Sequence, residues 1–585
     1  MEREKKKLAH PERGGEAFSW LLAAAAALFH LLVARGYRVY SGDQRHYLLL
    51  PFREIFHPFA PGDWLTWKTS HYHFFFSGFV RVLHGLGEML GLPFEWILFG
   101  AYCLLLLALF RGLLALVRAL GGGALHFALV LFLVFTYGDR PSRGIAFSFF
   151  LPSGYLVPSG MAAPFFLFSA AALFRGRRRT AYFLLGAAGL CHVNYGTAGF
   201  PLLLLWTLLL PGGFRSLGEA ASCLVLFLVP FLPTLYPTLA GFLSSLGDPS
   251  GAEGFRILSR LAAPGHYDAS SWPLPEVAAG FLPVLWGYAV LRKKSGPPGL
   301  ARILLFSALF FFLVYLAQLA GSGTAARLFF WRVFPYLQVL GFFVLAGEVL
   351  EREVPLRRIL WFAAAAAALF LLRDLLPGGP ARPAFPRGLL LGAGLAAAGL
   401  WVRRAPEGPG RRAGAGLGAI LFLGGTLVLS WAGIYLQRGY GLPRFEPLDG
   451  DPLCAWFREH TGPGTVVLVP PSYGRFRLLA RRAVPVTFGQ FPLGKGGEMV
   501  EWKSRLEKIT GVGDLFSSGG EGGLEARLDR AYFSLEPGEA ARIMKEFHAS
   551  FFVTRVGAGH LGDFREDGRF RKVFQAGRWV VFRLR

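Results

Sequence analysis

The sequence predicts a polytopic α-helical membrane protein of about thirteen spanning helices, followed by a small C-terminal extracytoplasmic α/β domain. Three observations indicate this fold class. The 585 residues are 53% hydrophobic and only 17% charged, with a mean hydropathy of +0.43, unlike ordinary soluble domains. Apolar runs suited to a bilayer recur through residues 17–438. From residue 440 onward the chain changes to charges, turn residues and short β-branched runs.

The basic residues predict how the chain is oriented. The formal net charge is +24, but Lys and Arg gather in short connectors between apolar runs, as cytoplasmic loops do, so we expect no nucleic-acid partner. Residues 1–16 are basic and are expected in the cytoplasm. No small-residue cleavage site follows the first apolar run, so we predict a retained span in place of a signal peptide. The connector RGRRR at 175–179 is also expected inside.

The apolar runs predict the helices in order. Segment 74–90 is apolar but carries Arg81, His84 and Glu88, so a helix along the membrane surface is preferred over a span. The first span begins near residue 17. The other spans are predicted at 94–117, 124–137, 154–174, 180–195, 201–210, 220–243, 277–291, 303–320, 329–350, 359–372, 389–402 and 417–436.

Residues 440–585 predict a small α/β domain outside the membrane. Short strands are expected at 466–469 and 550–554, and helices at 497–509 and 537–548. A hairpin is expected at 570–584. A basic group follows the first strand, and it indicates either a site for an anionic sugar or polymer or a solvated basic face; its members are Arg475, Arg477, Arg481 and Arg482.

The first outer loop, residues 35–76, combines ionisable residues and histidines between apolar runs, and we expect it to join the other outer loops in one site. A carboxylate beside a membrane suits a general base because partial desolvation raises its pKa, and arginines bind phosphate bidentately. An interfacial hydrogen bond or salt bridge is the alternative for each residue. The candidates are Asp43, Arg45, His46, Asp63, Lys68, His71, His73, Asp139, Arg140, Arg143, His266, Tyr267 and Asp268.

Further candidates lie at the ends of predicted spans. His192 and Asn194 are near the outer end of one span, and Arg327 and Arg332 begin another. Strongly polar residues at such depth are costly, so they indicate either function or hydrogen bonds between helices. The two arginines suit a lipid phosphate in the outer leaflet, because the positive-inside rule does not explain them.

A metal site stays open at this point. His71 and His73 are two residues apart and share one face of an extended segment, and Asp43 or Asp63 would add a carboxylate for a divalent ion. No HExxH spacing accompanies them, so no residue is assigned as a ligand. The four cysteines predict neither a disulfide framework nor a zinc site.

Several segments of the chain resemble the GT-C superfamily of integral-membrane glycosyltransferases, which use sugars linked to polyprenyl phosphate. These are GDQRHYLLLP at 42–51, GDW at 62–64, PSGYLVPSG at 152–160, LCHVNYG at 190–196 and PGHYDASSW at 264–272. The tail, with LCAWFREHTGPGTVVLVPP at 453–471, also resembles the extracytoplasmic domain of a bacterial family of unassigned function within that group.

The resemblance implies a catalytic base in the first outer loop. In this sequence the resemblance assigns that role to Asp43, and Asp63 is the second candidate. Members of the superfamily often have two adjacent acidic residues in this loop, whereas Gln44 follows Asp43 here, which leaves the need for a divalent metal open. The implied function is a glycosyltransferase of the bacterial inner membrane that moves a sugar from a polyprenyl-phosphate donor to a lipid, glycan or protein acceptor.

In this hypothesis Asp43 deprotonates the acceptor hydroxyl while Arg327, Arg332 or Arg140 stabilises the departing phosphate. One alternative is a transporter or flippase for lipid-linked glycans, which predicts related halves or paired broken helices that the sequence does not show convincingly. The other is a non-catalytic scaffold for envelope polysaccharide assembly, in which Asp43 and Asp63 only cap helices. No nucleotide-binding loop is present.

Overall fold

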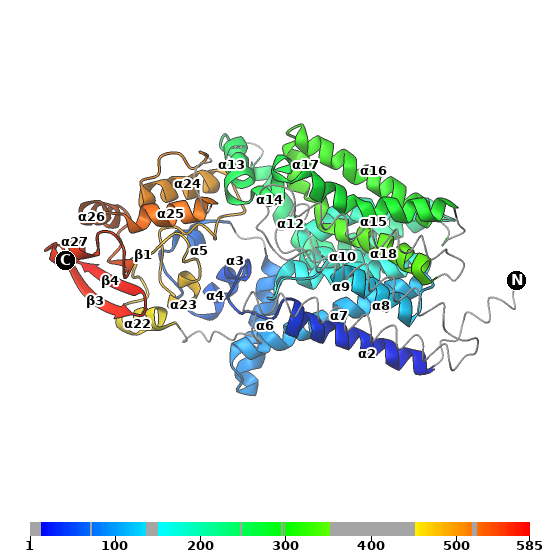
Figure 1. Ribbon diagram of the computed structural model, residues 1–585, viewed down its shortest axis with the longest axis horizontal. Helices are drawn as coiled ribbons and strands as arrows, with labels where there is room; N and C mark the ends of the chain where they lie inside the picture. The colour runs from blue at the N-terminus through cyan, green and yellow to red at the C-terminus, as the bar shows by residue number, and fades with distance from the viewer. Residues whose placement is uncertain are drawn as a thin grey trace, which may run out of the picture.

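The computed structural model describes residues 13–70, 73–135, 150–245, 248–293, 297, 299–350, 451–517 and 523–585. A bundle of apolar helices forms one end of the molecule, and a small sheet with its own helices forms the other (Figure 1). The short helices of the first outer loop, α3 (Gln44–Tyr47), α4 (Leu49–Ile55) and α5 (Trp64–Lys68), lie between the two.

Five helical segments among the described residues are long and apolar enough to cross a membrane. Shorter apolar helices occur at Trp20–Leu32, within α2 (Arg13–Phe29) and the π-helix after it (His30–Ala34), and in α8 (Ala124–Leu133), α9 (Pro158–Phe174) and α11 (Val193–Leu209). The total of about thirteen spans stays a prediction. The helices predicted at 359–372, 389–402 and 417–436 lie outside the described residues. The five long segments are Phe94–Ala119 (α7), Leu217–Gly241 in α12, Leu274–Lys293 (α15), Leu300–Leu319 (α16) and Gly323–Leu350.

The last of these segments is interrupted, and its break is important for the site. It consists of α17 (Gly323–Leu328), the 3₁₀ turn η6 (Phe330–Val333) and α18 (Phe334–Leu350). Helices α15 and α18 pack closely where Gly287 meets Gly341, because a Cβ on Gly287 would lie 3.2 Å from the Gly341 Cα. Helix α10 (Arg178–Cys191) packs on α9 and α12.

Helix α6 (Phe74–Leu90) forms where the sequence predicts a helix along the membrane surface. It runs crosswise to α2 and α7 in Figure 1, and it is not one of the five long apolar segments. Large apolar side chains point outward along it; Val82 is 71% exposed and Met89 76%. An exposed apolar face on a crosswise helix suits the boundary between lipid and water.

Between α12 and α15 the chain forms α13 (Gly251–Ile257), the π-helix η4 (Leu258–Ala262), α14 (Pro264–Tyr267) and the short turn η5 (Ala269–Ser271). Figure 1 shows α13 and α14 at the end of the bundle nearest to the C-terminal domain. Helix α13 packs against α24 of that domain.

The C-terminal domain contains a four-stranded mixed sheet in the order β1-β2-β4-β3. Strand β1 (Val467–Leu468) pairs parallel with β2 (Phe551–Arg555), and β4 (Trp579–Leu584) pairs antiparallel with β2 and with β3 (Phe570–Ala576). These strands and the β3–β4 hairpin lie where the sequence predicts them. The helices are α22 (Pro452–His460), α23 (Phe476–Ala480), α24 (Gly496–Thr510), α25 (Gly523–Phe533), α26 (Pro537–Glu546) and α27 (Leu561–Glu566).

The first outer loop and the C-terminal domain share a hydrophobic core. Tyr37, Phe52 and Phe59 of the loop belong to the same buried cluster as Phe457 and Val467 of the domain. The domain is therefore packed directly onto the loop that carries Asp43.

Candidate functional site

A tight turn presents Asp43 at the start of α3. Gly42 has a positive φ of 51°, and a Cβ there would collide with the Tyr155 hydroxyl. Gln44 is fully buried; its side chain accepts a hydrogen bond from the Tyr40 backbone N–H at 2.6 Å and donates one to the Leu156 carbonyl at 3.4 Å. Contacts with the segment before α9 thus fix the turn, and the Asp43 side chain remains exposed.

Three tyrosines from separate segments lie close enough to Asp43 for its negative charge to raise their pKa. Burial raises the pKa of Tyr47, the negative charge of Asp43 raises it further, and the positive charge of Arg332 lowers it. Burial and then Asp43 raise the pKa of Tyr155. Burial raises the pKa of Tyr267, Arg332 lowers it and Asp43 raises it. Asp43 and Arg332 therefore act on the same small region, and the tyrosines there stay protonated at neutral pH.

The broken helix brings Arg332 to this region. Phe329 adopts a left-handed φ of 48° between α17 and η6, and the Arg332 guanidinium lies over its ring at 4.7 Å. The Nε of Arg332 is buried and has no hydrogen-bond partner among the described residues. A buried donor without a partner is costly, and an anionic ligand would satisfy it.

Histidines extend the cluster from Tyr47. The ring of His73 is 4.6 Å from that of Tyr47 and 6.0 Å from that of His192, and His46 also contacts Tyr47, at 5.8 Å. The Nδ1 of His192 accepts a hydrogen bond from the Asn194 backbone at the start of α11. Within the part of the chain that the structure describes, no group of three or more His, Cys, Asp or Glu side chains converges; His71 lies outside that part.

Only some of the candidates from residues 264–272 belong to this cluster. Tyr267 belongs to the cluster, and the His266 ring packs on Phe329 at 5.6 Å. Asp268 instead accepts hydrogen bonds from the backbone and hydroxyl of Ser270 at the start of η5. Arg327 lies over Phe255 at 4.6 Å and donates to the Gly251 carbonyl at 3.2 Å, so it is bound to α13. Asp139 and Arg140 lie outside the described residues.

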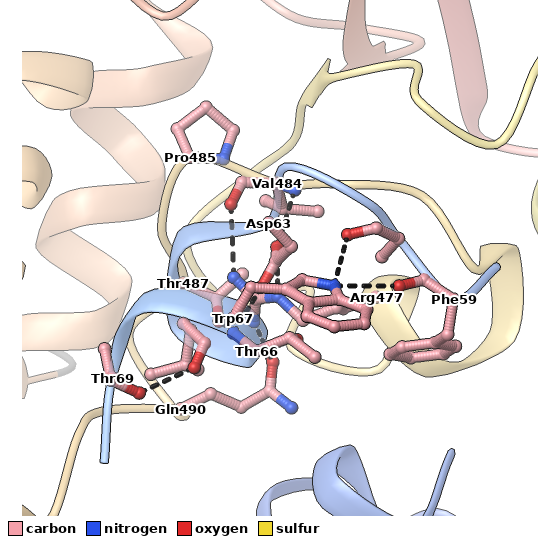
Figure 2. Close-up of polar contacts among 12 residues, drawn as sticks. Phe59, Asp63, Thr66, Trp67, Thr69, Arg477, Val484, Pro485, Thr487 and Gln490 are labelled. Carbon is pink, nitrogen blue, oxygen red and sulfur yellow. Dashed lines mark hydrogen bonds and ion pairs between the residues drawn. The ribbon is translucent and has the colours of Figure 1, made fainter. Parts of the chain in front are cut away.

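Asp63 occupies a different environment from Asp43, and Figure 2 shows its partners. It is 1% exposed, it forms an ion pair with the Nε of Arg477 at 2.7 Å, and it accepts hydrogen bonds from the backbone N–H groups of Thr66 and Val484 at 2.8 and 3.0 Å. Arg477 also donates to Gln490 and to the Val484 carbonyl. The pair joins α5 to the C-terminal domain.

This network reaches the turn of Asp43. The Gln490 amide donates to the Arg45 carbonyl at 2.8 Å, and the Arg45 side chain returns to the Gly42 carbonyl at 3.1 Å. The sequence singles out neither Tyr155 nor Gln490, and it indicates Tyr47 only as an aromatic residue suited to the headgroup layer. Tyr155 stands in the segment PSGYLVPSG, but nothing in the sequence indicates that it touches Gly42.

Comparisons with known proteins give a distant likeness. Residues 449–509 match a family described as a domain of unknown function (DUF6798), and the sequence matches no curated protein. The structure of ArnT from Cupriavidus metallidurans bound to undecaprenyl phosphate is 16% identical, with a TM-score of 0.48, and the match covers 98% of each chain. The apo form of that protein is 15% identical, with a TM-score of 0.43, over 97% of this chain and 98% of that one. An oligosaccharyltransferase from Archaeoglobus fulgidus, in complex with Zn and sulfate, is 11% identical, with a TM-score of 0.40, over 92% of this chain and 68% of that one.

Proposed function

We propose that the protein is a membrane glycosyltransferase that transfers a sugar from a polyprenyl-phosphate donor to a lipid, glycan or protein acceptor. One observation carries the proposal. Asp43 has an exposed carboxylate, and Arg332 has a buried Nε without a hydrogen-bond partner among the described residues; the charges of both shift the pKa of Tyr47 and of Tyr267. The resemblance of GDQRHYLLLP and PGHYDASSW to GT-C motifs falls on the segments that carry Asp43, Tyr47 and Tyr267.

The two charges suit the two ends of a glycosyl transfer. Asp43 takes the proton of the acceptor hydroxyl as the hydroxyl oxygen forms a bond to the anomeric carbon. The bond from that carbon to the donor phosphate oxygen breaks, and the electron pair leaves with the phosphate. Arg332 neutralises the leaving phosphate, and its unsatisfied Nε becomes a donor to a phosphate oxygen. In this proposal the neutral hydroxyls of Tyr47 and Tyr267 donate further hydrogen bonds to the phosphate.

We further propose the orientation predicted from the charges. Residues 1–16 lie in the cytoplasm, residues 17–438 form the membrane domain, and residues 440–585 lie outside the bacterial inner membrane. Arg118 and Arg175 lie close together near the ends of α7 and α9, and Arg175 follows the opposite end of α9 from Tyr155, which supports placing these arginines on the cytoplasmic side. His46, His192 and His266 line the proposed site, with Asp139 and Arg140 as further candidates. We assign Asp63 a structural role in place of catalysis.

The test is sugar transfer by the full-length protein, reconstituted with a labelled polyprenyl-phosphate sugar and membrane extract as the acceptor source. We expect Asp43→Asn to lower turnover by about 10²-fold or more, because a positioned general base contributes that much. Arg332→Gln is expected to lower turnover, and Arg332→Lys to restore part of it. Asp563→Asn, an exposed carboxylate in α27, is the control.

Full transfer by Asp43→Asn would refute the role of Asp43. If neither Asp43→Asn nor Arg332→Gln changed transfer by the reconstituted protein, the site would not be a glycosyltransferase centre. A cellular product that then depended on the protein but not on these side chains would favour the scaffold hypothesis.

A further inference from the structure

The corner of the chain that leads to Arg332 has a rare backbone conformation. Phe329 joins α17 to η6 with a φ of 48° and a ψ of 48°, which is left-handed and an outlier for a bulky residue. Such a conformation persists only where the surrounding structure holds it, and it is often found at functional sites. The corner therefore needs contacts that fix it, and Arg332 follows three residues later.

A buried glutamine spans this corner. Gln318 lies in the last turn of α16 and is 8% exposed. Its amide nitrogen donates to the Ala325 carbonyl of α17 at 3.2 Å, and its amide oxygen accepts from the Trp331 indole N–H of η6 at 2.9 Å. One hydrogen bond reaches the chain before Phe329, and the other reaches it after. Gln318 thus fixes the two sides of the corner relative to each other.

Aromatic packing fixes the η6 side of this bridge. Trp331 is fully buried, and its ring contacts that of Trp272 at 5.3 Å. The Trp272 indole in turn donates to the Gly265 carbonyl at 3.0 Å, in the segment that carries Tyr267. A fully buried ring in a close-packed interior has few alternative positions. The direction in which the chain leaves Trp331 toward Arg332 is therefore set by these contacts together with the corner.

The Phe329 ring connects the corner with the guanidinium of Arg332. The ring is 1% exposed, the guanidinium lies over it at 4.7 Å, and the Tyr267 ring contacts it at 5.5 Å. Stacking fixes the plane of a guanidinium, so a rotation of the corner would move the guanidinium as well. The buried Nε of Arg332, which has no hydrogen-bond partner in the described part of the chain, would then change its direction.

We propose that Gln318 is a positioning residue, whose amide holds the corner at Phe329 so that the Arg332 guanidinium meets the phosphate of the polyprenyl-phosphate donor. This inference rests on the proposed function, because Gln318 acts through Arg332 and does not itself touch the phosphate. A polar side chain buried in the membrane domain is costly unless it is hydrogen-bonded. Here both the nitrogen and the oxygen of the amide bind the corner.

The experiment measures binding of undecaprenyl phosphate to the full-length protein in neutral detergent, from the rise of its thermal unfolding midpoint with lipid concentration. This probe carries the leaving phosphate and requires no transfer. Arg332→Gln is expected to weaken binding about tenfold, since it removes charge-assisted hydrogen bonds. Gln318→Met fills a similar volume without the two hydrogen bonds and is expected to weaken binding about fivefold. Trp331→Phe breaks one of these bonds from its other end and is expected to act in the same direction, so the test does not depend on one variant folding.

The double variant separates positioning from stability. If Gln318 acts through Arg332, Gln318→Met combined with Arg332→Gln should bind no more weakly than Arg332→Gln alone. A role in folding stability alone would give the same additional loss in both backgrounds. An additive loss in the double variant, or wild-type affinity in Gln318→Met, would overturn the positioning role.

The matched control is Ser307→Ala, about three turns away in the same helix. Ser307 is fully buried and accepts from the Trp206 indole N–H at 2.9 Å, so this variant loses a hydrogen bond of the same kind. We expect a lower midpoint without ligand and wild-type affinity for undecaprenyl phosphate. Equal weakening in Ser307→Ala and Gln318→Met would overturn the positioning role. Wild-type binding in Arg332→Gln would instead overturn the phosphate site of the proposed function, and the role of Gln318 with it.

Discussion

The Asp63–Arg477 pair is a structural ion pair at the residue scale. Both side chains are 0% exposed, so removing one partner leaves a buried charge without compensation. We expect Arg477→Met to cost about 3–5 kcal/mol of folding stability, seen as a lower thermal unfolding midpoint. Arg477→Lys is expected to recover only part of it, because an ammonium group cannot reproduce the planar fork that reaches Asp63, Gln490 and Val484 together.

The matched control is Arg542→Gln. Arg542 is 66% exposed and pairs with Glu546 at 3.8 Å within α26, an arrangement worth about 0.3–0.5 kcal/mol. A midpoint for Arg477→Met that equals that of Arg542→Gln would contradict the structural role of the buried pair.

A second residue-scale prediction concerns Gly42. Gly42→Ala places a side chain on a residue with a φ of 51° and against the Tyr155 hydroxyl, so the turn and Asp43 must shift. The left-handed backbone conformation alone is expected to cost an alanine about 1–2 kcal/mol of folding stability. We expect transfer activity to fall at least tenfold while the protein still folds, because small displacements of a catalytic group have large kinetic effects. Gly62→Ala separates the causes, since Gly62 has a φ of 87° but open space around it. Equal loss in both variants would exclude the collision as the cause.

The residues of the site were predictable from the sequence to different degrees. Asp43 stands out as an acidic residue in a polar loop between apolar runs, and the structure leaves it exposed beside tyrosines. Asp63 has the same sequence character, yet its partner Arg477 is 414 positions away. Sequence spacing carries no information on such a contact. For the same reason Arg477 was grouped with a basic face, although it is fully buried.

At the scale of elements, helices α13 and α24 contact each other through two glycines, Gly254 and Gly496. A Cβ on Gly254 would collide with the Gly496 backbone, and one on Gly496 would lie 2.5 Å from the Ser250 carbonyl oxygen. Gly497 also donates its N–H to Asp248 at 3.2 Å. The close approach therefore depends on the absence of side chains at two positions.

We expect Gly254→Ala to separate the two helices at a cost of about 1–3 kcal/mol, the usual range for overpacking a tight contact. Limited proteolysis should then cut more rapidly around 246–250, between α12 and α13. Gly538→Ala in α26 is the control, because the nearest atom to a Cβ there is Arg569 Nη2 at 3.8 Å. Equal proteolysis of Gly254→Ala and the wild type would show that the contact tolerates a methyl group.

The long helices could be predicted from apolar runs in the sequence, whereas the short helices could not. The runs at 94–117 and 303–320 correspond to α7 and α16, and the hairpin predicted at 570–584 forms as β3 and β4. Helices α3, α4 and α5 were predicted only as loop, because four to seven residues are too few to show a helical period. Their positions depend instead on burial against the C-terminal domain, which a local pattern does not reveal.

At the scale of the whole molecule, the outer loop, the C-terminal domain and one end of the bundle form a continuous body. The loop and the domain share one buried cluster, and Ser70 donates hydrogen bonds from its N–H and hydroxyl to Glu498 of α24. The turn of Asp43 is thus held from the bundle side by Tyr155 and from the domain side by Gln490. Any movement of the domain is expected to change the geometry at Asp43.

The orientation of this body in the membrane yields the last prediction. Arg177 is exposed in the turn between α9 and α10, and Lys572 is exposed on β3 of the C-terminal domain. If the basic turn is cytoplasmic, a membrane-impermeant maleimide should label Lys572→Cys in cells with a permeable outer layer, and Arg177→Cys only after the inner membrane is opened. Three native thiols are buried, and burial raises the pKa of Cys454, so a Cys103→Ser background is expected to stay unlabelled. If Arg177→Cys were labelled while the inner membrane is closed and Lys572→Cys were protected, the proposed topology would be wrong and its inverse would hold. The Asp43 site and the C-terminal domain would then face the cytoplasm. The positive-inside rule instead predicts the basic turns on that side.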